Sequence, residues 1–261
     1  MVTSVEPAGR RSTPSGPVRT PRWRRLLVGR RLLRWAVRAV LGLVVLALVV
    51  LGLAWLSTPG VGDARQRVTA HLTAHGATPL RGDVPAKVAD ALLATEDSRF
   101  YDNGGVDWRG MLRAPLGVLA GHDLGGATLE QQLAKNVYEG GEHGPVEKVR
   151  EIALALKLDE AYSKPQILRM YLDDGYYGHG FYGLTDAAQG YFGVAPADLS
   201  WAQSTVLAGL FQAPSAYDPL LHPDLARARQ AHVLDRLVAV GTLTRAQADD
   251  VAADDWGLAG G

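Results

Sequence analysis

Two adjacent acids, Glu96 and Asp97, stand where the chain leaves a predicted helix. A carboxylate at the C-terminal end of a helix is disfavoured, because the helix dipole there prefers a cation. An acid kept in such a place is a candidate for proton transfer, for which Asp and Glu are common groups. The alternative is an acidic helix end in solvent, and the pair alone does not separate the two interpretations.

The run GGATLEQQLAKN, which begins at Gly125, combines a glycine pair with a helix start. The glycines free the backbone for close approach to a ligand. Thr128 and Gln131 have the spacing of a capping box, so the helix begins with N–H groups that suit an anion. Lys135 follows one turn later and adds a positive charge. The run favours an anion site, and an ordinary capped helix with a polar face is the alternative.

A third polar run opens the next predicted helix, where Lys148 and Arg150 flank Glu151. The apolar spacing predicts that Val149 and Ile152 face inward. A solvated helix face with ion pairs is the usual explanation of such a run on its own.

Helices must position these groups, because apolar residues recur at helical spacing along most of the chain from residue 63 onward. The stripes are Val84, Val88, Ala91, Leu92 and Thr95 behind Pro85; Val149, Ile152, Ala153 and Leu156; and Leu234, Leu237 and Val238. No sustained strand alternation, hairpin signal or internal repeat occurs. Roughly 200 residues can bury one core with a cleft, so we expect a mainly α class.

A basic tail and an apolar segment precede this region. Residues 1–38 hold ten arginines and one acid, and the remainder has 17 Lys and Arg against 26 Asp and Glu. The 18 residues from Ala39 to Leu56 lack charge, and a helix of that length reaches about 27 Å, close to the thickness of a membrane core. Trp35 and Trp55 suit the two interfaces.

We therefore predict three parts: a disordered basic cytoplasmic tail over 1–34, a transmembrane anchor over 35–57 and a domain over 58–261. A cleavable signal peptide has a shorter apolar region and a small-residue cleavage site. A core helix would not be apolar all round behind ten arginines. The chain has no cysteine, which excludes disulfides, thiolate metal sites and a Cys nucleophile.

Five segments, taken together and in order, resemble the family-51 glycosyltransferases, the peptidoglycan transglycosylases. The family shows E-D-x-x-F, G-G-S-T-I-T-Q-Q-L-x-K-N and R-K-x-x-E, followed by two aromatic and glycine-rich motifs. This chain has Glu96-Asp97 with Phe100, the run from Gly125, and Lys148 to Glu151. It continues with YLDDGYYGHGFYG from Tyr171 and AGLFQAPSAYDP from Ala208.

The resemblance implies a lysozyme-like α-helical head with a smaller membrane-associated jaw. It implies that Glu96 is the general base and that Glu151 assists departure of a diphosphate, with a divalent cation such as Mg²⁺ or Mn²⁺ as a possible helper. It assigns substrate binding to Asp97, Phe100, Thr128, Gln131, Gln132, Lys135, Asn136, Lys148 and Arg150. Tyr177 and Tyr182 fall in the fourth motif and are interpreted as packed aromatics.

The implied reaction joins lipid II units into β-1,4-linked glycan on the outer face of the plasma membrane. The expected partners are lipid II, nascent glycan, the membrane and a separate transpeptidase, because no transpeptidase motifs occur. We expect no nucleic-acid partner. A scaffold that binds lipid II without efficient turnover, and a hydrolase that cuts finished glycan, are the alternative functions.

Several residues depart from the family pattern, and they bear on the scaffold alternative. Asn103 replaces a His, Ala127 replaces a Ser, Asp173 replaces an Asn and Phe211 replaces a Pro. Glu130 replaces a Thr, and we expect it to bring a negative charge beside the anion site.

Glu147 replaces an Arg one turn before Glu151. Either it points into the anion site and opposes a diphosphate, or it turns to solvent and pairs with Arg150.

The arginines predict the topology, because basic residues beside a membrane span stay on the cytoplasmic side. A reporter fused after Gly261 should be active only outside the cytoplasmic membrane. Reporter activity in the cytoplasm would contradict both the anchor and the implied reaction.

Overall fold

The computed structural model describes residues 22–111, 127–140 and 144–259, with side chains from residue 33 onward. The chain forms two compact units, one up to Val49 and one from Val50 to Gly261. Each is described by itself.

The first unit is dominated by helix α1 (Arg22–Ser57), which continues into the start of the second. Its stretch Leu33–Ser57 has 25 residues and a mean hydropathy of 2.8, long and apolar enough to cross a membrane. Side chains from Leu33 to Val50 are exposed on all sides. A helix that is apolar all round needs an apolar environment, so α1 fits a membrane anchor.

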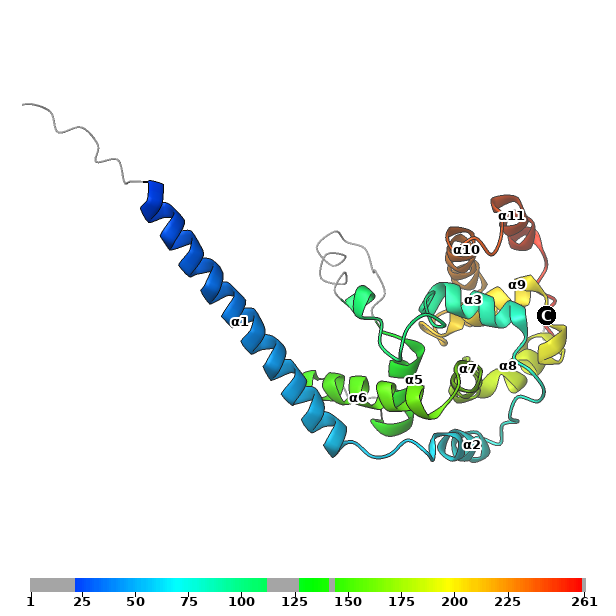
Figure 1. The fold of residues 1–261 in the computed structure, drawn as a ribbon. Coiled ribbons are helices and arrows are strands. Elements are labelled where there is room, and N and C mark those ends of the chain that lie inside the picture. The colour runs from blue at the N-terminus through cyan, green and yellow to red at the C-terminus, as the bar shows by residue number, and fades with distance from the viewer. Residues whose placement is uncertain (1–21, 112–126, 141–143, 260–261) are drawn as a thin grey trace, which may run out of the picture. The chain divides into compact units, whose positions relative to one another are not determined.

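The second unit is helical (Figure 1). Its α-helices are α2 (Ala64–Ala74), α3 (Ala86–Glu96), α5 (Leu129–Tyr138), α6 (Pro145–Ala161), α7 (Lys164–Asp174), α8 (Gly183–Phe192), α9 (Trp201–Leu210), α10 (Pro223–Ala239) and α11 (Arg245–Ala253), with a 3₁₀ turn, η1 (Pro196–Asp198), between α8 and α9. Over the described residues there is no strand, and the only β-bridge pairs Tyr176 with Tyr182. The predicted mainly α class with one N-terminal apolar helix is confirmed.

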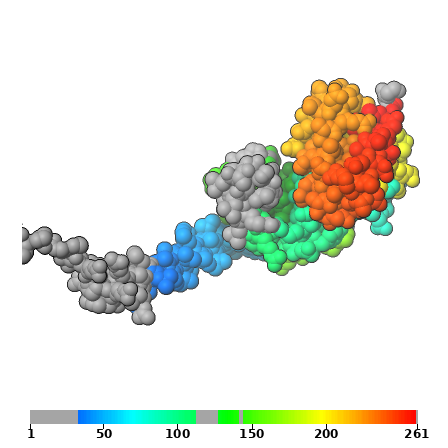
Figure 2. Space-filling view, turned by 90° about the horizontal axis from the view of Figure 1, so that it is seen from above, coloured from blue at the N-terminus to red at the C-terminus, as the bar shows by residue number. Residues whose placement is uncertain are grey.

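Two groups of helices meet where the candidate acids lie. Helix α3 packs against α9 and α10, and α5 packs against α6 and α7. The C-terminal helices α10 and α11, coloured orange to red, gather at one end of this unit (Figure 2). In the first group, α3 ends at Glu96. In the second group, α5 begins at Leu129.

The predicted stripe of α3 is confirmed at its three central residues, whereas only Ala153 of the predicted α6 stripe is buried. Val88, Ala91 and Leu92 of α3 are buried behind Pro85. On α6, Val149 and Ile152 are only half-buried. The fully covered positions of α6 are Glu151, Ala153, Leu154, Ala155 and Leu158. This set also has helical spacing, and its first member is charged, so a search for apolar residues selected the neighbouring face.

One lysine closes the C-terminal end of α1. Lys157 Nζ donates to the carbonyl oxygens of Trp55, Thr58 and Pro59 and to the Thr58 hydroxyl, over 2.8–3.1 Å. The last carbonyls of a helix lack partners within the helix and attract cations. The start of the second unit is therefore fixed to α6.

A glycine allows three segments to meet next to α5. Gly105 has φ +80°, and a Cβ there would lie 2.7 Å from the carbonyl oxygen of Ala155 in α6. The hydroxyl of Thr128, which precedes α5, donates to the Gly105 carbonyl at 2.7 Å. A side chain at this position would push α6 away from the start of α5.

Gly105→Ala should therefore lower the free energy of unfolding by about 3 kcal/mol, from left-handed strain of about 1–2 kcal/mol and a collision of similar size. Gly76→Ala is the matched control, because Gly76 has φ +68° and open space around its Cβ. It should cost only the strain. The measurement is denaturant unfolding of the full chain in detergent, and an equal loss in both variants would contradict the close packing at Gly105.

Candidate active site

A pocket of about 300 Å³ lies between α5 and α6. Its lining residues are Ala127, Gln131, Gln132 and Lys135 from the α5 segment and Gly144, Lys148 and Glu151 from the α6 segment. Two runs that the sequence marked separately thus form one site. Gly125 and Gly126 of the first run lie outside the described residues.

The capping box predicted for α5 is confirmed, and it leaves a donor without a partner in the pocket. Gln131 N donates to Thr128 Oγ1 at 3.2 Å, and Gln131 Oε1 accepts from Thr128 N at 3.0 Å. Gln131 is 1% exposed, and its Nε2 has no hydrogen-bond partner within the described part of the chain. An unsatisfied buried donor costs about 1–3 kcal/mol, so this amide is ready for an acceptor on a ligand.

Glu151 faces the pocket from the buried side of α6. It is 6% exposed, and its Oε2 accepts from Lys148 Nζ at 2.7 Å. Lys148 is half-exposed, so its ammonium can serve both this carboxylate and a ligand. With Lys135 the pocket holds two cations and one carboxylate.

Gln132 connects this pocket to Glu96. Its Nε2 donates to Glu96 Oε2 at 3.3 Å, and its Oε1 accepts from the Tyr171 hydroxyl at 2.7 Å. Burial and the nearby Glu96 carboxylate raise the pKa of Tyr171 well above its ordinary value. Tyr171 therefore stays a donor, and a donor at Oε1 turns the amide nitrogen of Gln132 toward Glu96.

Arg229 of α10 faces the same carboxylate, and the sequence did not single it out. Its Nη2 lies 3.8 Å from Glu96 Oε1, and its Nε donates to the Gly209 carbonyl at 3.2 Å. Its side chain is 11% exposed, and burial lowers its pKa from the ordinary Arg value. No local pattern marks an arginine so far along the chain from Glu96; only the packing of α10 on α3 brings them together.

Phe211, one of the departures from the family pattern, supports Tyr171. The two rings stack with centroids 5.0 Å apart and an interplanar angle of 20°. Phe211 also contacts the edge of Tyr177. Tyr177 is fully buried and Tyr182 stacks on His75, so these two tyrosines of the fourth motif are packed aromatics as predicted.

Asp97, Phe100 and Thr128, predicted to bind substrate, are engaged in holding the site together. Asp97 accepts from Asn103 Nδ2 at 3.0 Å and from Leu129 N at 3.3 Å, which fixes the first turn of α5. Phe100 is buried, and Thr128 uses its hydroxyl on the Gly105 carbonyl and the cap of α5. None of them lines the pocket, and their role in binding stays a prediction.

Asn136 and Arg150 also lie outside the pocket lining. Asn136 is exposed and hydrogen-bonds Asp174 at the end of α7. Arg150 Nε donates to Glu139 Oε1 at 2.7 Å, and this Glu139 side chain is only 3% exposed. A substrate role for either residue stays a prediction.

The expectation that Glu130 places a negative charge beside the anion site is wrong. Glu130 is fully buried and pairs with Lys164 Nζ at 2.7 Å. Lys164 also donates to Asn103 Oδ1 at 3.0 Å. Burial raises the pKa of Glu130, and Lys164 opposes that shift. Asn103 and Glu130 therefore share one cation away from the pocket.

Glu147 neither pairs with Arg150 in solvent nor lines the pocket. Its predicted partner Arg150 pairs with Glu139 instead. The half-buried Glu147 carboxylate folds back against Gly144, which lines the pocket. An acid in the first turn of a helix is favoured by the dipole, so Glu147 stabilises the start of α6 at the edge of the pocket.

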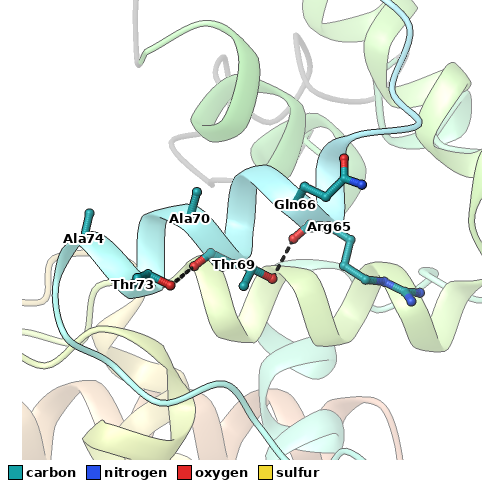
Figure 3. A pocket seen from close by; sticks show the side chains of 6 residues that line it. All are labelled: Arg65, Gln66, Thr69, Ala70, Thr73 and Ala74. Atoms are coloured by element: carbon teal, nitrogen blue, oxygen red, sulfur yellow. Dashed lines mark hydrogen bonds between the residues drawn. The ribbon is translucent and has the colours of Figure 1, made fainter.

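A larger depression of about 640 Å³ lies on the outer face of α2, but its lining lacks catalytic groups. Figure 3 shows its walls, formed by Arg65, Gln66, Thr69, Ala70, Thr73 and Ala74. The Thr69 and Thr73 hydroxyls donate to the carbonyls of Arg65 and Thr69, each at 2.8 Å. Its hydroxyls are thus occupied, and the pocket between α5 and α6 remains the candidate site.

Comparisons with known proteins agree on one family. Residues 67–238 match the transglycosylase family model. Penicillin-binding protein 1A of Neisseria flavescens is 42% identical over 175 residues, 66% of this chain and 22% of the relative. Penicillin-binding protein 2a of Streptococcus pneumoniae strain R6 is 39% identical over 173 residues, 66% of this chain and 23% of the relative.

A crystal structure of penicillin-binding protein 1A from Haemophilus influenzae is 22% identical with a TM-score of 0.43, covering 69% of this chain and 18% of that one. The chain spans about a fifth of the length of these proteins. From the family match and the identity to these relatives, the chain belongs to the transglycosylase family, the family-51 glycosyltransferases that its motifs predicted.

Proposed function

We propose that this chain is a membrane-anchored enzyme that polymerises lipid II into β-1,4-linked glycan strands of peptidoglycan. One observation carries the proposal: Gln132 both lines the cation-containing pocket and hydrogen-bonds Glu96. A proton acceptor and a diphosphate site are thereby adjacent, as transfer from a diphosphate donor to a sugar hydroxyl requires.

Glu96 is the general base in this proposal. It takes the proton from the 4-hydroxyl of the acceptor sugar, and the hydroxyl oxygen attacks the anomeric carbon of the donor. The bond between that carbon and the diphosphate oxygen breaks with inversion, and undecaprenyl pyrophosphate leaves with the bonding electrons. A positioned carboxylate contributes about 10²–10⁴-fold to such a step.

The pocket between α5 and α6 holds the diphosphate. Lys135, Lys148 and Gln131 Nε2, which has no partner among the described residues, supply donors for its oxygens, and Gln132 adds another beside Glu96. Negative charge grows on the leaving group as the bond breaks, and positioned cations stabilise that state more than the ground state.

A divalent cation at the diphosphate is also proposed. Mg²⁺ is commonly held by one or two carboxylates together with phosphate oxygens, and Glu151 is the carboxylate of the pocket lining. Bound there, the cation would neutralise phosphate charge. In the described ranges no three His, Asp or Glu side chains group to hold a metal without such a ligand.

The rest of the proposal follows from the anchor. Residues 1–34 are cytoplasmic, the second unit is outside the membrane, and a separate transpeptidase cross-links the product. The scaffold alternative loses part of its support, because Glu130 pairs with Lys164 and does not line the pocket.

Glu96→Gln keeps the side-chain shape but removes the proton acceptor, so polymerisation of lipid II should fall at least about 100-fold. Binding of the diphosphate donor should persist, because the lysines are unchanged. Glu160→Gln, at an exposed position of α6, is the matched control and should retain full activity.

The same purified protein should be incubated with lipid II and, separately, with polymeric glycan. Glycan formation supports the polymerase, whereas binding of lipid II without turnover indicates the scaffold and cleavage of polymer indicates the hydrolase. A Glu96→Gln enzyme at the normal rate would remove the assigned role of Glu96.

Tyr171→Phe should lower kcat by about tenfold with little change in KM, because Gln132 loses a hydrogen bond of about 1–1.5 kcal/mol and its amide is free to turn from Glu96. Tyr177→Phe is the control: its hydroxyl is equally buried but donates to the Leu172 carbonyl at 3.1 Å. It should lower stability and leave kcat near normal. Equal losses of kcat in both variants would show that Tyr171 acts only through packing.

A further inference from the structure

We propose that a second pocket, between α2, α3 and α7, is a binding site for an uncharged saccharide. This pocket, named here the α3–α7 hollow, has a volume of about 720 Å³. Its polar walls are Arg65, Asp83, Asp90, Tyr101, Gln166 and Arg169. It shares no lining residue with the pocket between α5 and α6, so it is a separate site.

The charges of the hollow suit a neutral ligand. Two aspartates and two arginines line it, and their formal charges cancel. A phosphate-bearing ligand needs an excess of cations, and a basic peptide needs an excess of acids. A ligand with many hydroxyl groups and no charge can instead donate to the carboxylates and accept from the guanidinium groups.

Two of the side chains that can donate to a ligand, Arg169 and Gln166, are already held by hydrogen bonds within the protein. Arg169 Nη1 donates to the Leu80 carbonyl at 2.9 Å, which leaves its other N–H groups for a ligand. Gln166 Oε1 accepts from Ser163 N at 3.0 Å, which leaves its amide N–H₂. Side chains held in advance lose little conformational entropy when a ligand binds.

The carboxylate of Asp90 is a hydrogen-bond acceptor without a donor among the described residues. It is half-buried on α3, and burial alone raises its pKa. Within the described ranges no hydrogen bond or ion pair reaches its carboxylate. A half-buried carboxylate is stabilised by donors, and sugar hydroxyl or acetamido N–H groups are suitable ones.

Tyr101 adds an aromatic surface to the lining of the hollow. It is 61% exposed, and its ring makes a T-shaped contact with the Phe100 ring, with the ring centroids 5.1 Å apart. An exposed ring beside polar groups suits a ligand with one apolar face and polar edges. A pyranose ring has this character.

That the bound saccharide is the enzyme's own glycan rests on the proposed function, whereas the hollow itself does not. The test uses β-1,4-linked N-acetylglucosamine oligomers, titrated into the full chain in detergent by calorimetry. Tyr101→Ala and Asp90→Asn should each weaken binding about tenfold, the effect of losing about 1.4 kcal/mol. Trp108→Ala, an exposed aromatic outside the hollow, is the control and should bind normally.

Glu96→Gln and Gln132→Ala separate this site from the active site, and both should bind the oligomers normally. Absence of binding by the unaltered chain, or loss of binding in these two variants but not in Tyr101→Ala, would overturn the proposal. This outcome is independent of whether lipid II is polymerised.

Strand length in the lipid II reaction then identifies the source of the saccharide. Shorter strands from Tyr101→Ala, at an unchanged initial rate, indicate that the hollow holds the growing product. Weakened binding with unchanged strand length still supports the site and assigns it to glycan already present in the wall.

Discussion

The end of α3 and the beginning of α5 are held together by two neighbouring carboxylates, and the rest of the site depends on this contact. Asp97 accepts from the backbone of Leu129, and Glu96 accepts from the side chain of Gln132. The end of α3 is the negative end of its dipole and the start of α5 is the positive end of the other. An acid that is unfavourable on one helix is thus stabilised by the next.

Near this contact, a single lysine pairs with two carboxylates. Lys164 serves Glu130 and Asp159, both at 2.7 Å, and the Asn103 amide as well. Removing one partner of such a group leaves a buried charge uncompensated, which is far more destabilising than the pair is stabilising. The acids of the active site itself draw on other cations, Arg229 for Glu96 and Lys148 for Glu151.

Sequence reasoning identified what is local. The capping box at Thr128, the stripe of α3 and the apolar length of α1 depend on residues within a turn or two of each other, and all three are present. The pocket joins two motifs because α5 and α6 are neighbours in sequence and pack together.

What the sequence did not reveal depends on distant packing. Arg229 reaches Glu96 only because α10 packs on α3, and Glu130 turns from the pocket only because Lys164 of α7 lies behind it. The buried face of α6 was misassigned because its first residue, Glu151, is an acid that periodicity counts as exposed.

The clamp made by Lys157 has a practical consequence for defining a soluble fragment. Ala54, Thr58 and Val61 are buried, and Lys157 takes all four of its acceptors from Trp55 to Pro59. The last turns of the apolar helix thus belong to the fold of the domain as well as to the anchor. A cut near residue 57 would remove the buried Ala54 and the Trp55 carbonyl while keeping Thr58, Pro59 and Lys157, so a fragment that retains the whole clamp must begin inside the helix, before Ala54.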